Sequence, residues 1–421
     1  MSDFDPKAFF GALFEAAVAA ADPAVVLPRF LPDRPKGRTV VIGAGKGAAQ
    51  MAQALEAHWP GPLEGLVVTR YGYAAPCRHV AVHEAAHPVP DAAGLEGARR
   101  LMDLVSGLGE DDLVIALICG GGSALLPAPP SGMTLDDEIA VNTALLASGA
   151  PISAMNTVRK HLSRIKGGRL AALAAPAQVV TLVVSDIPGD VPALVSSGPT
   201  VPDASTRHEA LEIVRAFGLD LPSAALRHLH SPAADAPRPD DPAFARNDVH
   251  VIASAAVSLE AAAQRARDFG IEAAILSDAI EGEAREIARM HGAIAREVAL
   301  RERPFAKPVV LLSGGETTVT LRGKGKGGRN TEFLLSLALA IEGVAGIDAF
   351  AADTDGIDGS EDNAGAFADA SSTARMRAAG LDPKALLAAN DAWTAFEAVD
   401  DLYAPGPTGT NVNDLRAILI R

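Results

Sequence analysis

Glycine-rich turns follow several apolar runs in this sequence, and two of the turns carry cations. Gly43–Ala48 follows the run Thr39–Ile42 and contains Lys46, and Gly323–Asn330 contains two lysines and Arg329. Glycine lets the backbone turn tightly and point its N–H groups at an anion at the start of the next helix. Both turns therefore indicate sites for phosphate groups.

Positive charge is scarce in the rest of the chain. Lys and Arg number 37 against 52 Asp and Glu, which gives a net charge of -15. No overall positive field exists to collect nucleic acid or an anionic membrane, so an anion must be bound by a local cluster. Five of the nine lysines lie in or beside glycine turns and clustered arginines: Lys46, Lys160, Lys166, Lys324 and Lys326.

The turn Gly43–Ala48 nearly matches the dinucleotide-binding fingerprint, with Ala48 in the third glycine position. Arg70 ends the second strand, where an acidic residue usually holds the adenosine ribose, so only an NADP-dependent reductase fits this interpretation. A glycine turn that serves only helix packing is the structural alternative. Two more glycine turns, Cys119–Ser123 and Ser313–Thr317, follow apolar strands, and together these turns exceed what one dinucleotide needs.

The run Asn156–Arg169 is rich in cations and ends near a double glycine. We expect a basic helix, in which Arg159, Ser163 and Lys166 recur every three or four positions and share one face. Such a face can bind a small anion. A solvated helix surface is the alternative, because most charge runs are no more than that.

Carboxylates follow two apolar strands, in Ser185–Asp190 and in Asp353–Gly359. At such positions they can hold Mg²⁺ or accept a proton from a substrate, although aspartate and glycine also form ordinary turns. The string His83–His87 matches the HExxH pattern of zinc peptidases, but Pro88 disfavours a helical conformation at His87. We therefore expect no zinc site there.

Alanine-rich amphipathic stretches alternate with short β-branched runs, which is typical of an α/β protein with parallel sheets. The expected strands are Thr39–Ile42, Leu66–Thr69, Leu113–Ile118, Val179–Val184, Val249–Ala253, Ala273–Leu276, Val309–Leu312 and Ala349–Ala352. The expected helices are Pro6–Ala21, Gly47–His58, Gly94–Leu108, Leu135–Ser148, Thr206–Phe217, Ala255–Asp268, Gly282–Leu300 and, after a strand hairpin and the lysine-rich turn, Thr331–Leu339.

The segment Ser231–Pro242 is rich in proline and aspartate and has no apolar period, so we predict a linker there. It would separate two Rossmann-like domains, residues 1–240 and 241–421, with largely parallel sheets flanking an active-site cleft. Two cysteines and an acidic start favour the cytoplasm, no apolar run is long enough to span a membrane, and a homodimer is possible.

Many of these strings together resemble the glycerate 2-kinase family with a MOFRL-type C-terminal domain, some of whose members have been labelled hydroxypyruvate reductases. The resemblance covers nearly the whole chain. The strings that carry it are Gly43–Lys46, His87–Asp91, Gly120–Ala124, Asn156–Gly168, Ser185–Asp190, Ser196–Thr200, Gly314–Thr317, Gly327–Asn330 and Asp353–Gly356. The resemblance implies ATP-dependent, Mg²⁺-assisted phosphorylation of the 2-hydroxyl of D-glycerate.

By motif, the family's catalytic residues correspond to Lys46, Asp190 and Arg329 in this sequence. We expect Lys46 and Arg329 to offset charge on the transferred phosphate and Asp190 to orient or deprotonate the hydroxyl. Asp186 and Asp355 are expected to hold the metal. The residues expected to bind glycerate are Ser123, Asn156, Arg159, Lys160 and Lys166. The residues expected to bind the nucleotide are Gly43, Gly45, Gly121, Gly122, Gly314, Gly315, Glu316, Thr317, Lys326, Asn330 and Asn411.

Two other functions stay open at this stage. The first is the NADP-dependent hydroxypyruvate reductase. The second is a regulatory module whose basic loops bind a sugar phosphate without transferring it.

Overall fold

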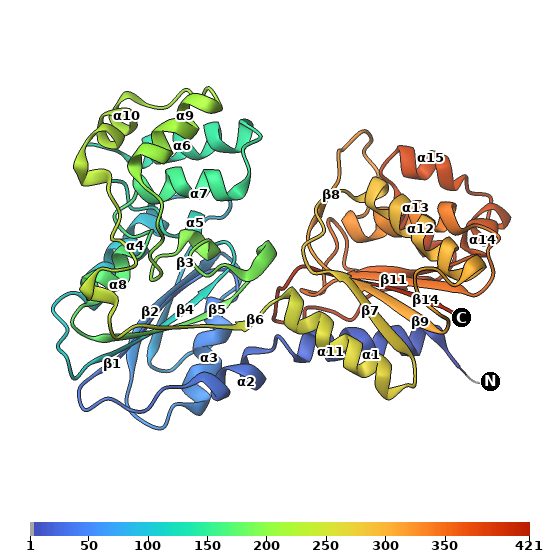
Figure 1. Cartoon of the computed structure of the whole chain (residues 1–421), viewed down its shortest axis with the longest axis horizontal. Coiled ribbons are helices and arrows are strands. Elements are labelled where there is room, and N and C mark those ends of the chain that lie inside the picture. Colours follow the sequence, from blue (N-terminus) through green and yellow to red (C-terminus); the bar gives the residue numbers. More distant parts are fainter. Residues whose placement is uncertain (1–3) are drawn as a thin grey trace. The chain divides into compact units, whose positions relative to one another are not determined.

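The computed structural model describes residues 4–421, which form two compact units (Figure 1). The central unit is Pro23–Ile252, and the terminal unit is Ala253–Arg421 together with the first segment of the chain up to Asp22. The predicted boundary at residue 240 therefore lies inside the central unit, and the predicted assignment of the first helix to the N-terminal domain was wrong.

The first helix, α1 (Pro6–Ala19), belongs to the terminal unit because its apolar face packs there. Asp5 caps the helix by accepting a hydrogen bond from the N–H of Lys7, and Pro6 occupies the first turn, where no N–H partner is needed. Phe10 is buried and stacks on Phe350 with ring centroids 5.8 Å apart. The helix lies alongside α11 (Ala255–Asp268).

The central unit contains a six-stranded parallel sheet in the order β3-β2-β1-β4-β5-β6. This is the Rossmann strand order, and its direction reverses between β1 and β4, which is where ligands bind in such sheets. The Rossmann-like prediction is confirmed for this unit, although β3 was not predicted. The strands are β1 (Thr39–Ala44), β2 (Glu64–Arg70), β3 (Val80–Ala85), β4 (Leu113–Cys119), β5 (Gln178–Val184) and β6 (Asp248–Ala253).

A separate helical layer lies beyond one end of this sheet and has an apolar core of its own (Figure 1). It consists of α6 (Leu135–Ala147), α7 (Ile152–His161), α9 (Arg207–Ala216) and α10 (Ser223–His230). The other helices of the unit are α2 (Pro23–Val26), α3 (Ala48–His58), α4 (Ala92–Val105), α5 (Gly122–Leu125) and α8 (Arg169–Ala174). Short 3₁₀ turns are Leu27–Phe30, Pro188–Asp190, Val195–Ser197, Pro232–Ala234 and Pro242–Phe244.

Two local predictions for this unit were wrong. The basic run is not one helix, because α7 ends at His161 and residues 162–168 are not helical. Arg159, Ser163 and Lys166 therefore do not share a helix face. The segment Ser231–Pro242 is no linker between the units, since it contains a 3₁₀ turn whose Ala234 is buried in the core of the helical layer.

The terminal unit contains a mixed six-stranded sheet in the order β13-β12-β11-β14-β9-β7. Only the β7–β9 pair is parallel, so the prediction of a second largely parallel sheet was wrong. The last strand of the chain enters between β9 and β11 in the opposite direction, and β12 folds back directly on β11. The strands are β7 (Glu272–Ser277), β9 (Val309–Ser313), β11 (Ile347–Asp353), β12 (Gly365–Asp369), β13 (Leu402–Tyr403) and β14 (Asp414–Ile420).

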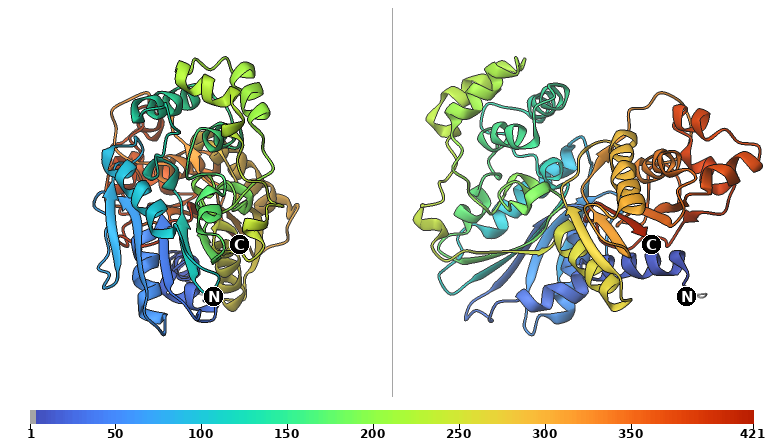
Figure 2. Two further views of the ribbon diagram at one scale, coloured as in Figure 1. Left: turned by 90° about the vertical axis from the view of Figure 1, so that its left-hand side faces the viewer. Right: turned by 45° about the vertical axis from the view of Figure 1, so that its right-hand side comes forward.

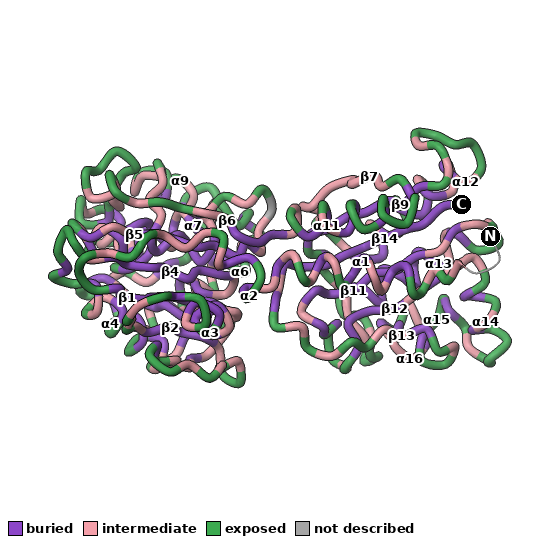
Figure 3. The backbone as a smooth tube through the Cα atoms, turned by 90° about the horizontal axis from the view of Figure 1, so that it is seen from below, coloured by how far each residue is buried: buried purple, intermediate pink, exposed green. Residues whose placement is uncertain are grey.

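Helices cover both faces of this sheet, as the right-hand view of Figure 2 shows. Successive side chains of a strand point to opposite faces of the sheet, so each face has its own apolar core. In β9, Val309 and Leu311 face one helix layer, whereas Val310 and Leu312 face the other. Figure 3 shows the central strands β11 and β14 as buried, whereas the edge strand β7 is mostly intermediate. One layer is α1 with α11, and the opposite layer includes α12 (Ala284–Arg301), α13 (Arg329–Ile341), α14 (Ser372–Ala378), α15 (Pro383–Ala388) and α16 (Ala392–Glu397).

A small second sheet pairs β8 (Gly282–Glu283) with β10 (Thr317–Thr318) in parallel, where the sequence had suggested a hairpin. Within residues 4–421, no single helix is long and apolar enough to cross a bilayer. One bent pair, Pro6–Ala19 with Pro23–Phe30, meets the length and composition required.

We predict that Phe10→Ala weakens the terminal unit and leaves the central unit unchanged. Loss of a buried phenylalanine costs about 3–5 kcal/mol, and Phe10 packs on β11. Hydrogen exchange should therefore accelerate in β11 and β14 but not in β1 and β4. Phe217→Ala, at an exposed position of the central unit, is the matched control. Equal acceleration in both sheets would contradict the division of the chain.

Candidate functional site

The first candidate site lies in the central unit at the carboxyl ends of β1 and β4, where the strand order reverses. The turn after β1 approaches β4 so closely that a side chain at position 45 could not fit. A Cβ on Gly45 would lie 2.3 Å from the Cys119 sulfur, and the backbone there has a φ of +136°, which favours glycine. The sequence therefore needs glycine here for packing, whatever else the turn does.

The N–H groups of this turn bond to the protein itself. The Gly45 N–H donates to the Val68 carbonyl (3.1 Å) and the Lys46 N–H to the Gly120 carbonyl (2.8 Å). The Gly47 N–H donates to the Cys119 sulfur (3.2 Å). The prediction that these backbone groups bind an anion is therefore not supported, and the structure favours the packing interpretation of Gly43 and Gly45.

The Lys46 side chain is the group that this turn presents. It is half-buried, and its ammonium makes no hydrogen bond or ion pair with any residue in 4–421. A Cβ on Gly121 would lie 3.2 Å from Lys46 Cγ and also 3.2 Å from His87 Nε2, so the lysine and the imidazole flank this glycine. Burial, with the charges of Lys46 and Arg70, lowers the pKa of His87 to about 4. His87 is therefore a neutral imidazole at neutral pH.

Two carboxylates come from the loop after β5. A Cβ on Gly120 would lie 1.8 Å from Asp186 Oδ2, so the Asp186 carboxylate lies directly on the turn after β4. Asp190 follows Gly189 and has a φ of 51°. This left-handed conformation is energetically unfavourable for any residue that has a side chain. No described residue forms a hydrogen bond or ion pair with the Asp190 side chain.

A second strained turn adjoins these groups. Ser196 and Ser197 both have left-handed backbones, with φ values of 52° and 59°. Ser196 Oγ donates to the Cys119 carbonyl (2.5 Å). A Cβ on Gly122 would lie 2.3 Å from Ser196 Oγ. The glycines at 120–122 are therefore sites of close approach by Asp186, His87 and Ser196.

Three of the five residues predicted to bind glycerate form one hydrogen-bonded chain. Ser123 Oγ and Ser197 Oγ are 2.7 Å apart, and Ser197 Oγ donates to Asn156 Oδ1 (3.0 Å). Arg159 donates to the same amide oxygen (3.3 Å) and to Asn142 Oδ1 (2.9 Å). Arg159 has no carboxylate within ion-pair distance in the described part of the chain. Its charge stays available to an anion.

The other two predicted glycerate ligands are buried in ion pairs of the helical layer. Lys160 is fully buried and pairs with Asp203, and Lys166 Nζ lies 2.8 Å from Glu138 Oε1. Removing Lys166 would leave the buried Glu138 carboxylate uncompensated, and removing Lys160 would leave the partly exposed Asp203 without its ion pair. Both residues therefore hold the layer together, and we remove them from the glycerate-binding set.

A second candidate site belongs to the terminal unit and is centred on Arg329, the first residue of α13. Arg329 Nε donates to Asp414 Oδ1 (2.9 Å), and Arg329 also pairs with Asp353. Burial acts to lower the pKa of Arg329, but the carboxylates of Asp414 and Asp353 raise it overall. Burial raises the pKa of Asp353 well above its usual value, although Arg329 opposes the shift. The guanidinium is held rigidly and stays charged.

The N-terminus of α13 is occupied by the protein's own carboxylate. Asp358 is fully buried and accepts the N–H groups of Asn330 (3.0 Å) and Thr331 (2.9 Å). This carboxylate takes the place that we had predicted for a polyphosphate. Asn330 is therefore a positioning residue of the helix start, with its amide also donating to Asp414 (2.8 Å).

The turn after β9 lies against the same cluster. Arg416 donates to the carbonyls of Gly314 (3.1 Å) and Gly315 (3.3 Å) and to Thr317 Oγ1 (3.3 Å), and it pairs with Asp414. Glu316 Oε1 lies 4.0 Å from Arg329. The structure thus brings the predicted residues 314–317 next to Arg329, with their carbonyls used internally.

Asp355, Asn411 and Lys326 complete the predicted residues of this unit. The loop that carries Asn411 bonds to the Asp355 turn, because the Thr408 N–H donates to the Asp355 carbonyl (3.1 Å). Lys326 Nζ lies 4.6 Å from the centre of the Trp393 ring and 3.5 Å from Glu361 Oε2. A cavity of about 260 Å³ lies beside Gly327, Gly328 and Arg329.

The predicted metal residues are not part of a ready-made cation site. No group of three or more His, Cys, Asp or Glu side chains suited to a metal ion occurs in the described residues. One Asp355 oxygen accepts the Ile357 N–H (2.9 Å), which leaves the other oxygen for a ligand. Mg²⁺ commonly binds one or two carboxylates and takes its other ligands from phosphates and water, so the residues fit a metal that arrives with a nucleotide. The HExxH string lies partly in β3, so it does not form the helix that a zinc peptidase needs.

Several residues of the site were missed by the sequence analysis. His87, Ser196 and Ser197 occur in strings that carried the family resemblance, but we gave them no role. Asp353 also occurs in such a string. No sequence pattern pointed to Asp414, because this residue begins β14, a strand that was not predicted.

Comparisons with known proteins identify relatives over the full chain. A family model described as domain of unknown function DUF4147 matches residues 9–230, and the MOFRL family model matches residues 309–414. An Agrobacterium vitis protein named "Putative hydroxypyruvate reductase" is 52% identical over 100% of this chain and 95% of its own. The D-glycerate 2-kinase of Thermotoga maritima is 38% identical over 98% of each chain. A crystal structure of glycerate kinase from Thermotoga maritima has a TM-score of 0.90 and 37% identity over 99% of both chains.

We predict that Lys46→Met raises the pKa of His87 from about 4 toward its ordinary value of 6.5, because a positive charge beside the imidazole is removed. A histidine NMR titration, assigned with His87→Gln, measures the shift. Lys36→Met, at an exposed position before β1, should leave it unchanged. An unshifted His87 in Lys46→Met would mean that the two side chains do not interact.

Proposed function

Because the chain belongs to the DUF4147/MOFRL glycerate kinase family, we propose that it transfers the terminal phosphoryl group of ATP to the 2-hydroxyl of D-glycerate. The products are 2-phosphoglycerate and ADP. Relatives at 38% and 39% identity, from Thermotoga maritima and Pyrococcus horikoshii, are named D-glycerate 2-kinase and glycerate 2-kinase, which supports this reaction.

The observation that carries the proposal is the unpaired Lys46 ammonium beside the neutral His87, at the strand ends where Asp186 also lies. Phosphoryl transfer needs positive charge near the transferred group and a carboxylate near the attacking hydroxyl. A neutral imidazole adds a hydrogen-bonding group without repelling Lys46. The same residues offer no strong nucleophile, since burial raises the pKa of the Cys119 thiol to about 12.

We assign Asp190 to the glycerate hydroxyl. Its carboxylate has no partner among the described residues, and its strained backbone holds it at a fixed position, which is how catalytic groups are often kept ready. A carboxylate at hydrogen-bond distance from the hydroxyl can orient it and take its proton as the new phosphate ester bond forms. Asp186 is the candidate for the metal.

Glycerate itself needs a partner for its carboxylate. Arg159 and Ser123 belong to one hydrogen-bonded chain through Ser197 and Asn156, and Arg159 has no acidic partner. We therefore assign the carboxylate to this chain, with the guanidinium supplying the charge.

Arg329 is the second proposed cation for the triphosphate. The carboxylates of Asp353 and Asp414 pair with it and raise its pKa overall, so the guanidinium stays charged. Bound ATP supplies the phosphoryl group, and Mg²⁺ offsets the charge on its oxygens. Asp355, Asn411 and Lys326 are candidates for contacts with this nucleotide in the terminal unit, and a homodimer stays a prediction.

A hydroxypyruvate reductase is the second candidate, because the Agrobacterium vitis relatives carry that name. The dinucleotide fingerprint works when the backbone N–H groups of the turn approach a pyrophosphate. In this chain those of Gly45, Lys46 and Gly47 bond to Val68, Gly120 and Cys119 instead. Arg70, the residue suited to a 2′-phosphate, stacks on Tyr73 with its Cζ 4.3 Å from the ring centre. The kinase therefore fits the chain better.

We expect the purified chain to convert D-glycerate and MgATP to ADP and 2-phosphoglycerate, because its free cations suit a triphosphate. Phosphorus NMR identifies the phosphorylated hydroxyl. With hydroxypyruvate and NADPH we expect no change in nicotinamide absorbance. NADPH oxidation without ADP formation would favour the reductase, and 3-phosphoglycerate as product would contradict the assigned hydroxyl.

We predict that Asp190→Asn lowers kcat by about 10²–10⁴-fold, because the amide cannot accept the hydroxyl proton. Asparagine tolerates the left-handed backbone and no hydrogen bond is lost, so the thermal stability should stay the same. Steady-state kinetics and a melting curve measure both quantities. Asp240→Asn, at an exposed position of the same unit, is the control. A loss of less than tenfold would remove Asp190 from the catalytic residues.

A further inference from the structure

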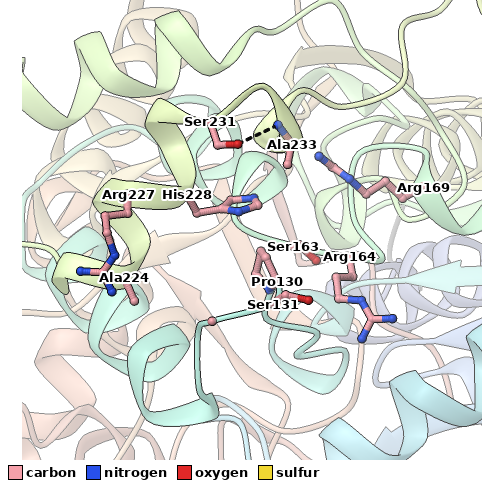
Figure 4. A pocket seen from close by; sticks show the side chains of 11 residues that line it. Pro130, Ser131, Ser163, Arg164, Arg169, Ala224, Arg227, His228, Ser231 and Ala233 are labelled. Atoms are coloured by element: carbon pink, nitrogen blue, oxygen red, sulfur yellow. Dashed lines mark hydrogen bonds between the residues drawn. The ribbon is translucent and has the colours of Figure 1, made fainter.

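A second basic cavity lies in the helical layer of the central unit (Figure 4). It has a volume of about 610 Å³, which is within the usual range for small-molecule sites. Three arginines and one histidine line it, Arg164, Arg169, Arg227 and His228, and the lining includes no aspartate or glutamate. This composition is unusual in a chain with a net charge of -15.

Two of these arginines are free to bind a ligand. Arg164 and Arg227 are exposed, and neither has a carboxylate within ion-pair distance in the part of the chain that the structure describes. Arg227 donates one hydrogen bond to Ser223 Oγ (3.1 Å). Asp137 lies outside the lining; hydrogen bonds from Thr134 lower its pKa, and the positive charge of Arg227 adds to that shift.

Arg169 is fixed in place without an ion pair. Its guanidinium donates to the carbonyls of Lys160 (2.7 Å), Lys166 (3.2 Å), Ala234 (2.9 Å) and Asp235 (3.1 Å). Burial lowers the pKa of Arg169 to about 10, although the charge of Asp235 opposes the shift, so the group is charged at neutral pH and has no direct ion pair within residues 4–421. An anion in the cavity would relieve this cost.

Neutral donors complete the lining. Ser163 Oγ accepts the N–H groups of Ile165 and Lys166 (both 3.2 Å), which leaves its own proton free to donate. His228 lies between Arg227 and Arg169 in Figure 4. Burial and the Arg169 charge lower its pKa, so at neutral pH it contributes a neutral N–H. Residues from α10, from the segment after α7 and from the start of α8 therefore line one cavity.

We propose that this cavity binds a small phosphate monoester, at a site separate from the candidate catalytic residues. Guanidinium groups match the oxygens of a phosphate in pairs, and cations from different elements can surround a dianion. The volume accommodates a small phosphorylated metabolite. The proposal does not depend on the reaction that the chain catalyses.

The experiment uses the full chain with Lys46→Met, which weakens phosphate binding at the strand-end site. Calorimetric titration with glycerol 3-phosphate should give one binding event per chain. Arg164→Gln with Arg227→Gln in the same background should weaken it at least tenfold. Arg215→Gln, at an exposed position outside the cavity, should leave the affinity unchanged. A melting curve tests whether the double variant is folded. If the double variant does not fold, the single variant Arg227→Gln is used in its place.

Inorganic phosphate and malate distinguish the chemistry of the ligand. We expect glycerol 3-phosphate and inorganic phosphate to compete with each other, and malate to bind at least tenfold more weakly. Equal binding by the double variant, or no binding by Lys46→Met alone, would overturn the site. Tighter binding of malate would overturn the phosphate class.

Discussion

The close approach of the turns after β1 and β4 is the constraint on which the central unit depends. Gly45 lies against the Cys119 backbone and sulfur at a separation that excludes a side chain, and a side chain at position 120 would displace the Asp186 carboxylate. Packing at this density leaves the backbone only one arrangement. The position of the Lys46 backbone, and with it the origin of its side chain, follows from this contact. His87 and Ser196 reach the same place because Gly121 and Gly122 leave room for them.

Charge compensation has the corresponding role in the terminal unit. Arg329 and Arg416 both pair with Asp414, and Asp353 adds a second carboxylate to Arg329. Removal of one member of such a buried network leaves the others uncompensated, which commonly costs 3–5 kcal/mol. Arg329 is therefore structural as well as a candidate for catalysis, whereas Lys46 and Asp190 have no such partners. The two units hold their functional groups by different means.

The sequence predicted the elements that depend on local patterns. Strands β1, β4, β5 and β9 are β-branched or leucine-rich runs and were found. Strand β12 reads Gly-Ala-Phe-Ala-Asp, which has no β-branched residue, and it forms because β11 pairs with it. Tertiary pairing of this kind is not visible in a local window. The partners of Lys160 and Lys166 were missed for the same reason, since Asp203 and Glu138 reach them only in the folded layer.

The glycine turns show why a motif can be found correctly and interpreted wrongly. The turns Gly43–Ala48 and Gly323–Asn330 were predicted to bind phosphate groups, and residues 314–317 to bind the nucleotide, yet backbone groups of all three turns bond within the protein. The turn after β1 bonds to the turn after β4, the start of α13 binds Asp358, and the carbonyls at 314 and 315 bind Arg416. The N–H groups of residues 45–47, 330 and 331 are therefore already bonded within the protein. We propose that side-chain cations supply the charge for phosphate instead, Lys46 in the central unit and Lys326 and Arg329 in the terminal unit. A site built this way binds phosphate through charge more than through shape, so its affinity should depend on ionic strength more strongly than that of a backbone cradle.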